Sequence, residues 1–213
     1  MKKTMVLTGI ILFAGALLAA GCGAPSGSVT SSNTGIRGIS GGLPPTGAQS
    51  VSTIAEAIQS TGMNIRVPRD TLGGAPTAVK TVAADKELGT NTYIYCTYSN
   101  GMNLNAESSP QVDYAAQIAN MEQLNRTASI HPDKLPYLVT VAGHQGMLWP
   151  AHMNQGDTQP GVPVLYWWDS GVSYSLYPPG TSSPTGVPNK TTVSPDTEST
   201  TINTLLKVAN SMY

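Results

Sequence analysis

The sequence predicts an α+β fold, an antiparallel sheet with helices packed on one face and a C-terminal helix. Seven short segments are rich in β-branched and aromatic residues and several alternate apolar with polar positions, which is typical of strands. Turn dipeptides join some of these segments directly, which favours antiparallel neighbours. The last segment, "ESTTINTLLKVANSMY", instead repeats apolar residues at helical spacing.

The first expected element is a short helix in "SVSTIAEAIQSTG". Ser50 or Ser52 can cap its start, and Gly62 can end it. Its apolar residues are helically spaced at Ile54, Ala57 and Ile58. A further possible helix lies in the middle of the chain, in "DYAAQIANMEQLNR".

The strands are expected at Ala78–Ala83, Thr92–Tyr98, Gly101–Ala106, Tyr137–Ala142, Gly146–Pro150, Pro163–Asp169 and Val172–Tyr177. Two hairpins are expected, with two-residue turns at Asn100-Gly101 and Ser170-Gly171. A third turn is expected where Gly143 and Gly146 flank His144-Gln145, because glycine permits the positive φ of a short turn.

Two sets of residues should supply the core. In the last hairpin, alternation places one group of large side chains on a common face, namely Leu165, Trp167, Val172, Tyr174 and Leu176. In the C-terminal helix, one apolar stripe is made by Ile202, Leu205, Leu206, Ala209 and Met212.

The N-terminus has the three parts of an export signal. Lys2 and Lys3 precede an apolar run of about 14 residues, Met5–Leu18, which is shorter than the ~20 residues of a bilayer span. The run closes in "LLAAGC", which resembles a bacterial lipobox, although Ala19 stands where leucine is usual. We expect removal of residues 1–21, acylation of Cys22 and anchoring by lipid at the extracytoplasmic face of the cell membrane. The alternatives are a secreted protein and a retained anchor.

Beyond Cys22 the chain divides into a spacer and a single α+β domain. Residues 22–50 are almost entirely Gly, Ser, Thr, Pro and Ala, with one charge at Arg37. Such a segment buries too little apolar surface to fold, so it should be a flexible linker with a mean reach of about 30 Å. Residues 51–213 have the length of an ordinary domain with its own core.

Charge and cysteine usage limit the class of protein. Processing removes two of the 11 basic residues and none of the 12 acidic ones, which leaves a formal charge near −3. No basic cluster remains, which argues against nucleic acid as a partner. With Cys22 acylated, Cys96 has no disulfide partner, and its alternating context "TYIYCTYS" predicts a buried, unreactive thiol.

Both ends of the domain resemble an extracytoplasmic bacterial family of unknown function. The segment "STIAEAIQSTGMNIRVPRDTLGGAPTAV" is similar to its opening helix, strand and turn. "VTVAGHQGMLW", "VLYWWDSGVSYSLY" and "INTLLKVANSMY" are similar to its G-x-x-G turn, its closing hairpin and its final helix. The family occurs on Gram-positive lipoproteins and at the outer ends of anti-sigma factors. The resemblance implies a small binding or sensing domain outside the membrane and no known reaction.

Two segments depart from the family pattern. The connection from Pro178 to Thr197 is long and rich in proline, and the possible helix in "DYAAQIANMEQLNR" is added. A specific surface is expected near that added helix.

No catalytic or metal-binding constellation stands out. His144, Met147, His152 and Met153 lie within ten residues, and imidazole with thioether suits copper, but the predicted strand and loop separate them. His131 is isolated, and Asp85 and Glu87 flank Lys86 in an expected solvated turn. No G-x-S-x-G motif occurs. We therefore expect no catalytic residues, no metal and no cofactor.

Tryptophans are the candidate contact residues. Trp167 and Trp168 are neighbours in a predicted strand, so their side chains must point to opposite faces, and one should lie at solvent or under a loop. Together with Trp149 they offer a possible contact for a protein or glycan partner. The leading hypothesis is a non-enzymatic lipoprotein with a binding or sensing domain at the cell envelope. The alternatives are an envelope hydrolase acting on glycan or peptide, and an assembly factor of the wall or spore.

Overall fold

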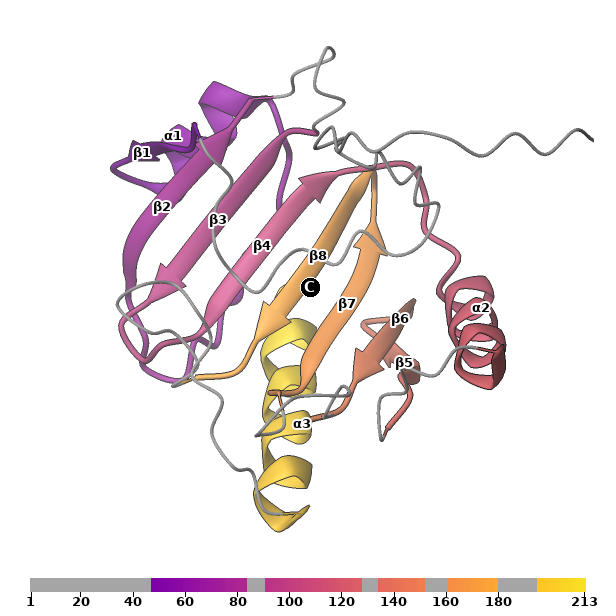
Figure 1. Ribbon diagram of the computed structural model, residues 1–213. Coiled ribbons are helices and arrows are strands. Elements are labelled where there is room, and N and C mark those ends of the chain that lie inside the picture. Colours follow the sequence, from indigo (N-terminus) through magenta and orange to yellow (C-terminus); the bar gives the residue numbers. More distant parts are fainter. Residues whose placement is uncertain (1–46, 84–90, 128–133, 152–160, 180–194) are drawn as a thin grey trace, which may run out of the picture. The chain divides into compact units, whose positions relative to one another are not determined.

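An eight-stranded sheet is the main element of the protein (Figure 1). The computed structural model describes residues 47–83, 91–127, 134–151, 161–179 and 195–213, all within one compact unit, Thr34–Tyr213. The strand order is β1-β2-β3-β4-β8-β7-β6-β5, and each neighbouring pair is antiparallel. The predicted α+β fold is confirmed.

Each of the seven predicted strands is present, with ends shifted by at most two residues. The strands are β1 (Gln49–Val51), β2 (Pro76–Val82), β3 (Tyr93–Tyr98), β4 (Asn103–Ser108), β5 (Tyr137–Val141), β6 (His144–Trp149), β7 (Val164–Asp169) and β8 (Val172–Tyr177). The helices are α1 (Ile54–Thr61), α2 (Tyr114–Thr127) and α3 (Pro195–Asn210). β1 was not predicted, because three residues are too few to show alternation. None of the described helices has the length and apolar character needed to cross a membrane.

Helix α1 begins with two hydrogen bonds that resemble a capping box. The Thr53 hydroxyl accepts a hydrogen bond from the Glu56 backbone N–H (3.1 Å), and the Glu56 carboxylate accepts one from the Ser52 backbone N–H (2.8 Å). Thr53 is therefore the N-cap, in place of the predicted Ser50 or Ser52. Gly62 ends the helix with a φ of 68° and donates to the Ile58 carbonyl, as predicted.

The two predicted hairpins are present. Ser170 and Gly171 have φ values of 51° and 87° and join β7 to β8 by a two-residue turn. The β3–β4 turn differs from the prediction, because Tyr98 still pairs with Met102 through its backbone N–H. Its loop thus has three residues and ends at Gly101, whose φ is 82°.

The predicted turn around His144 is displaced by two residues. Ala142 and Gly143, with φ values of 47° and 87°, form the turn from β5 to β6. His144 begins β6, and Gly146 lies inside that strand. A Cβ at Gly146 would lie 2.7 Å from the Tyr166 carbonyl oxygen. Glycine is needed there for close packing of neighbouring strands, so the predicted turn role of Gly146 is wrong.

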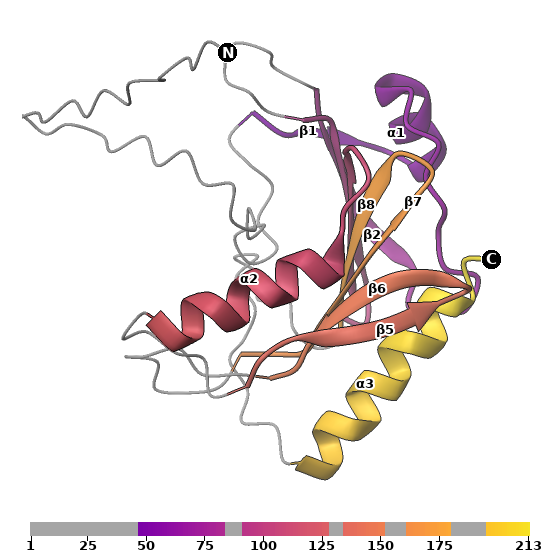
Figure 2. The ribbon, with the colours of Figure 1, turned by 90° about the vertical axis from the view of Figure 1, so that its right-hand side faces the viewer.

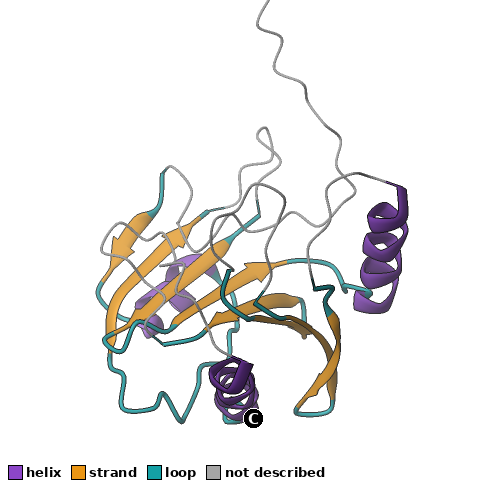
Figure 3. Cartoon of the chain, turned by 60° about the horizontal axis from the view of Figure 1, so that its bottom comes forward, coloured by secondary structure: helices purple, strands orange, loops and turns teal. Residues whose placement is uncertain are grey.

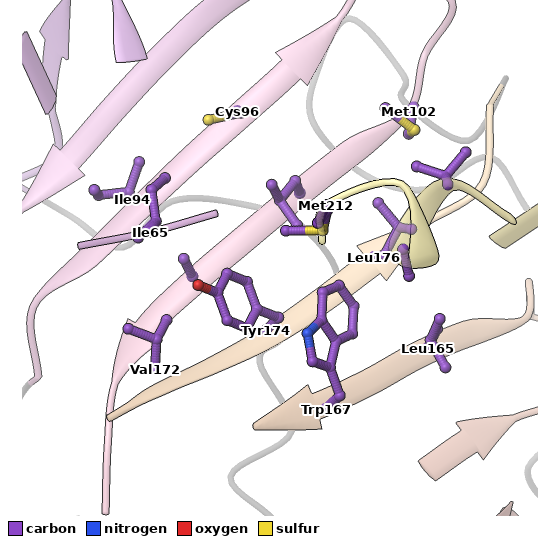
Figure 4. Close-up of a cluster of buried hydrophobic side chains, with 14 of the residues drawn as sticks. Ile65, Ile94, Cys96, Met102, Leu165, Trp167, Val172, Tyr174, Leu176 and Met212 are labelled. Carbon is purple, nitrogen blue, oxygen red and sulfur yellow. The ribbon is translucent and has the colours of Figure 1, made fainter. Parts of the chain in front are cut away.

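One face of the sheet carries the hydrophobic core (Figure 4). The residues predicted from the last hairpin are all buried on it, namely Leu165, Trp167, Val172, Tyr174 and Leu176. Strands β3 and β4 add Ile94, Cys96, Leu104 and Ala106. We call this the core face.

Helices α1 and α3 pack on the core face. Ala57 of α1 and the α3 residues Leu205, Val208 and Ala209 belong to the same buried cluster, and α3, seen nearly end-on in Figure 3, contacts β5, β7 and β8. Helix α2 lies on the other side of the sheet in Figure 2, where it contacts β5 and β6. The added helix predicted in the middle of the sequence therefore belongs to the opposite face.

Candidate functional site

Trp167 belongs to the core, so its prediction as a contact residue is wrong. Its side chain is 0% exposed, and its ring stacks on Tyr174 with centroids 4.9 Å apart. The β7 register pairs it with Tyr174 and Gly146. The two strands approach closely here, since a Cβ at position 146 would lie 3.3 Å from the Trp167 Cβ. A partner cannot reach this residue in the folded protein.

Trp168 and Trp149 lie on the face opposite the core. Alternation along β7 turns Trp168 away from Trp167, and the pairing of Trp149 with Val164 places Trp149 on the same side as Trp168. Both residues are half-buried. The Trp168 Nε1–H donates to the Ser109 carbonyl oxygen at 3.1 Å, which fixes the orientation of the indole.

This opposite face is rich in tyrosine and tryptophan, and we call it the aromatic face. Its rings come from four strands and are Tyr93, Tyr95, Trp149, Tyr166, Trp168 and Tyr177. Between the β3 and β7 rings lie the smaller polar residues of β4 and β8. Residue pairing gives one transverse row, in which Tyr95, Asn105, Ser175 and Tyr166 are successive neighbours.

Asn105 is the most unusual residue of the aromatic face. It is 2% exposed, and its Nδ2 atom has no hydrogen-bond partner within the described part of the chain. A buried amide without a partner costs about 1–3 kcal/mol, so such groups in native proteins usually meet a water or a ligand. Asn105 therefore provides a hydrogen-bond donor that the described fold does not use.

The tyrosines of the aromatic face act as neutral hydroxyl groups. Burial raises the pKa of Tyr166 and of Tyr177, and the two side chains are hydrogen-bonded to each other. Burial likewise raises the pKa of Tyr114, at the start of α2, to about 12. These phenols remain protonated at neutral pH and supply uncharged donors and acceptors beside the rings, whereas Glu107 of β4 adds a carboxylate that accepts a hydrogen bond from the Tyr93 hydroxyl at 2.8 Å.

A polar cluster surrounds Asp169 at the end of β7, on the core face. Its Oδ2 accepts hydrogen bonds from Arg66 Nε (2.8 Å) and from the Tyr213 hydroxyl (3.0 Å). Its Oδ1 accepts one from the Ser170 hydroxyl (2.7 Å). Burial opposes the charge, but these bonds outweigh it and hold the pKa of Asp169 below its ordinary value.

The Asp169 cluster joins four parts of the chain. Arg66 lies in the segment after α1 and also packs over the Tyr213 ring, with its Cζ 4.4 Å from the centroid. His144, at the β5–β6 turn, places its Nε2 3.9 Å from Asp169 Oδ1 and its ring beside Tyr213. Asp169 and Ser170 come from the β7–β8 turn. The arrangement fixes these segments to one another.

The cluster lacks the geometry of a catalytic triad. Ser170 donates its hydroxyl proton to Asp169 instead of facing His144, and the distance from His144 to the carboxylate exceeds hydrogen-bond length. Cys96 offers no alternative nucleophile, because burial raises its pKa to about 12. It is buried in β3, as the sequence predicts.

The structure separates the residues weighed for copper. His144 points to the core face and Met147, three positions later in β6, is buried on the aromatic face. Among the described residues, no group of three His, Cys, Asp or Glu side chains could hold a metal ion. His131, His152, Met153, Asp85, Glu87 and Cys22 lie outside the described residues.

Comparison with known proteins identified no similar protein. No family model matches the sequence, no curated protein matches it, and no solved structure matches the fold.

Proposed function

We propose that this protein is a lipid-anchored, extracytoplasmic binding protein whose domain contacts a protein or glycan partner at the cell envelope and catalyses no reaction. The anchor is Cys22, exposed as the new N-terminus by removal of residues 1–21. The export signal and its small residues before the cysteine support this location. Two acyl chains hold a protein stably in a membrane, because each buried methylene contributes about 0.8 kcal/mol.

The aromatic face is the proposed contact surface. The observation that carries the proposal is that two half-buried indoles, those of Trp168 and Trp149, lie on the same face of the sheet. A partner that covers the Trp168 ring gains apolar burial. Trp149 lies on the same face and extends the surface to β6.

The Asp169 cluster supports a binding role over a hydrolytic one. Its carboxylate is occupied by three hydrogen bonds from within the domain, and its serine faces the carboxylate. A general base needs its acceptor directed at the substrate. The cluster is therefore better suited to holding the fold together than to proton transfer.

The anchor is tested by Cys22→Ser in the native organism. We expect the variant to leave the membrane fraction for the medium, or to accumulate with residues 1–21 uncleaved. Cys96→Ser is the matched control, since Cys96 is buried, and its membrane retention should equal that of the wild type. Normal processing together with unchanged retention of Cys22→Ser would refute the anchor.

The contact surface is tested with Trp168→Ala. Binding to two separate preparations, purified cell-wall glycan and solubilised membrane protein, is measured for the wild type and the variant. We expect at least a tenfold loss of affinity for one preparation. Leu72→Ala is the control, because Leu72 is an exposed large apolar residue outside the sheet. Equal binding by the Trp168→Ala variant in both assays would remove the aromatic face as the contact.

A further inference from the structure

Strand β5 is an edge of the sheet and has no strand beside its outer side in the part of the chain that the structure describes. An edge strand presents a row of backbone N–H and C=O groups that can pair with another strand. Natural proteins usually protect such edges with charged residues, proline, bulges or very short strands. The five residues of β5, "YLVTV", include none of these protective residues.

The two edges of the sheet differ in this respect. β1 is only three residues long and its first two residues, Gln49 and Ser50, are polar and exposed. β5 exposes Tyr137 (44%) and Leu138 (45%), which are two of the three exposed large hydrophobic residues in the described part of the chain. Helices α2 and α3 both contact β5, yet they leave these two side chains at the surface.

We propose that β5 pairs with β5 of a second copy of this chain, antiparallel and around a two-fold axis, so that one sheet continues through both copies. An isologous contact of this kind requires only that the strand be complementary to itself. β5 carries no charge, so the two copies do not repel each other along the strand. An antiparallel partner also continues the pattern of every neighbouring pair in the sheet.

The two-fold axis sets the register of the proposed pair. The alignment that pairs all five residues is centred on Val139, which then lies opposite Val139 of the second copy. Leu138 lies opposite Thr140 of the second copy on the aromatic face, and Tyr137 lies opposite Val141 on the core face. This alignment places a side chain of the second copy directly beside each of the two exposed hydrophobic side chains. Five paired residues form a small contact, so the dimer should be weak and concentration-dependent.

Thiol cross-linking tests this pairing. The full-length chain carries Cys22→Ser, which leaves the buried Cys96 as its only native cysteine. One preparation carries Leu138→Cys and a second carries Thr140→Cys, both at exposed positions that should not disturb folding. Directly opposed residues have Cβ atoms about 4.5–5.5 Å apart, close enough for disulfide formation after a small movement.

We expect the mixed Leu138→Cys and Thr140→Cys disulfide to form at least tenfold faster than either homodimer under mild oxidation. Ser50→Cys, on the opposite edge, is the control and should cross-link slowly. Val139→Lys in either partner should abolish the mixed product, whereas Ser50→Lys should not. Because Val139 also packs against the core, circular dichroism first establishes that the Val139→Lys variant is folded. Equal rates for all pairs, or a rate unaffected by Val139→Lys, would overturn the proposal. The same oxidation can be carried out in cells that produce both cysteine variants. A cross-linked product whose mass differs from that of two copies of this chain would also overturn the proposal.

Discussion

The Nε atom of Arg66 lies 2.8 Å from Oδ2 of Asp169, a residue that is only 5% exposed. The two residues are 103 positions apart in the sequence, and the contact ties the segment after α1 to the end of β7. The same carboxylate oxygen accepts the Tyr213 hydroxyl. One buried carboxylate thus connects the first and last parts of the described domain.

Asp169→Asn should destabilise the domain. The amide keeps the shape of the side chain but removes the charge and turns one acceptor into a donor, which leaves a neighbouring donor unpaired. Because Arg66 is about half exposed, we expect a loss of about 1–3 kcal/mol in the free energy of unfolding, measured with urea. Asp70→Asn is the control, since its pair with Lys207 is exposed and should contribute much less to stability. Equal losses would contradict the role of Asp169.

The contribution of Asp169 should depend on pH. Its pKa in the folded protein lies below its ordinary value of 3.8. The stabilisation is therefore fully present above pH 3.8 and is lost as the pH falls through the folded-state pKa. Urea titrations between pH 7 and pH 2.5 should show the wild type converging on Asp169→Asn in acid. A constant difference across this range would show that the carboxylate charge contributes nothing.

The two adjacent tryptophans should respond differently to truncation. Trp167→Ala opens a cavity in the core and should cost about 3–5 kcal/mol. Trp168→Ala removes a half-buried ring and one hydrogen bond, and should cost about 1–2 kcal/mol. Acrylamide should quench Trp168 fluorescence much more than that of Trp167, measured in the Trp167→Phe and Trp168→Phe variants of a chain that also carries Trp149→Phe. The reverse order would contradict the assignment of the two faces.

Gly146→Ala should destabilise the sheet where β6 meets β7. The added Cβ would lie 2.7 Å from the Tyr166 carbonyl oxygen, so the backbone must shift. We expect a loss of about 1–3 kcal/mol in a urea titration. Gln145→Ala, at the exposed neighbouring position, should change stability by less than about 0.5 kcal/mol. A neutral Gly146→Ala variant would show that this close approach is not required.

Local patterns in the sequence were sufficient to predict seven of the eight strands of the sheet, the β3–β4 and β7–β8 hairpins and the last helix. The end of α1 at Gly62 and the turn at Ser170-Gly171 were predictable because each depends on a positive φ at one or two residues of known type. β1 escaped prediction because it exists only through its pairing with β2. Helix α2 was found as a segment, but its placement on the aromatic face depends on contacts with β5 and β6.

The candidate site was predicted only in part. Alternation required Trp167 and Trp168 to point to opposite faces, but which of the two is buried depends on contacts with other strands, such as the stacking of Trp167 on Tyr174. The Asp169 cluster joins residues 44 and 103 positions from the carboxylate, a distance at which no sequence pattern operates. No sequence pattern marks Asn105 as buried, because its burial arises from its neighbours across the sheet.

The most direct test of a lipid-anchored binding protein is intact mass spectrometry of the native protein extracted from membranes. The account predicts a chain that begins at Cys22 and carries the added mass of acyl groups on that residue. A chain that retains residues 1–21, or one whose Cys22 thiol is unmodified, would contradict it.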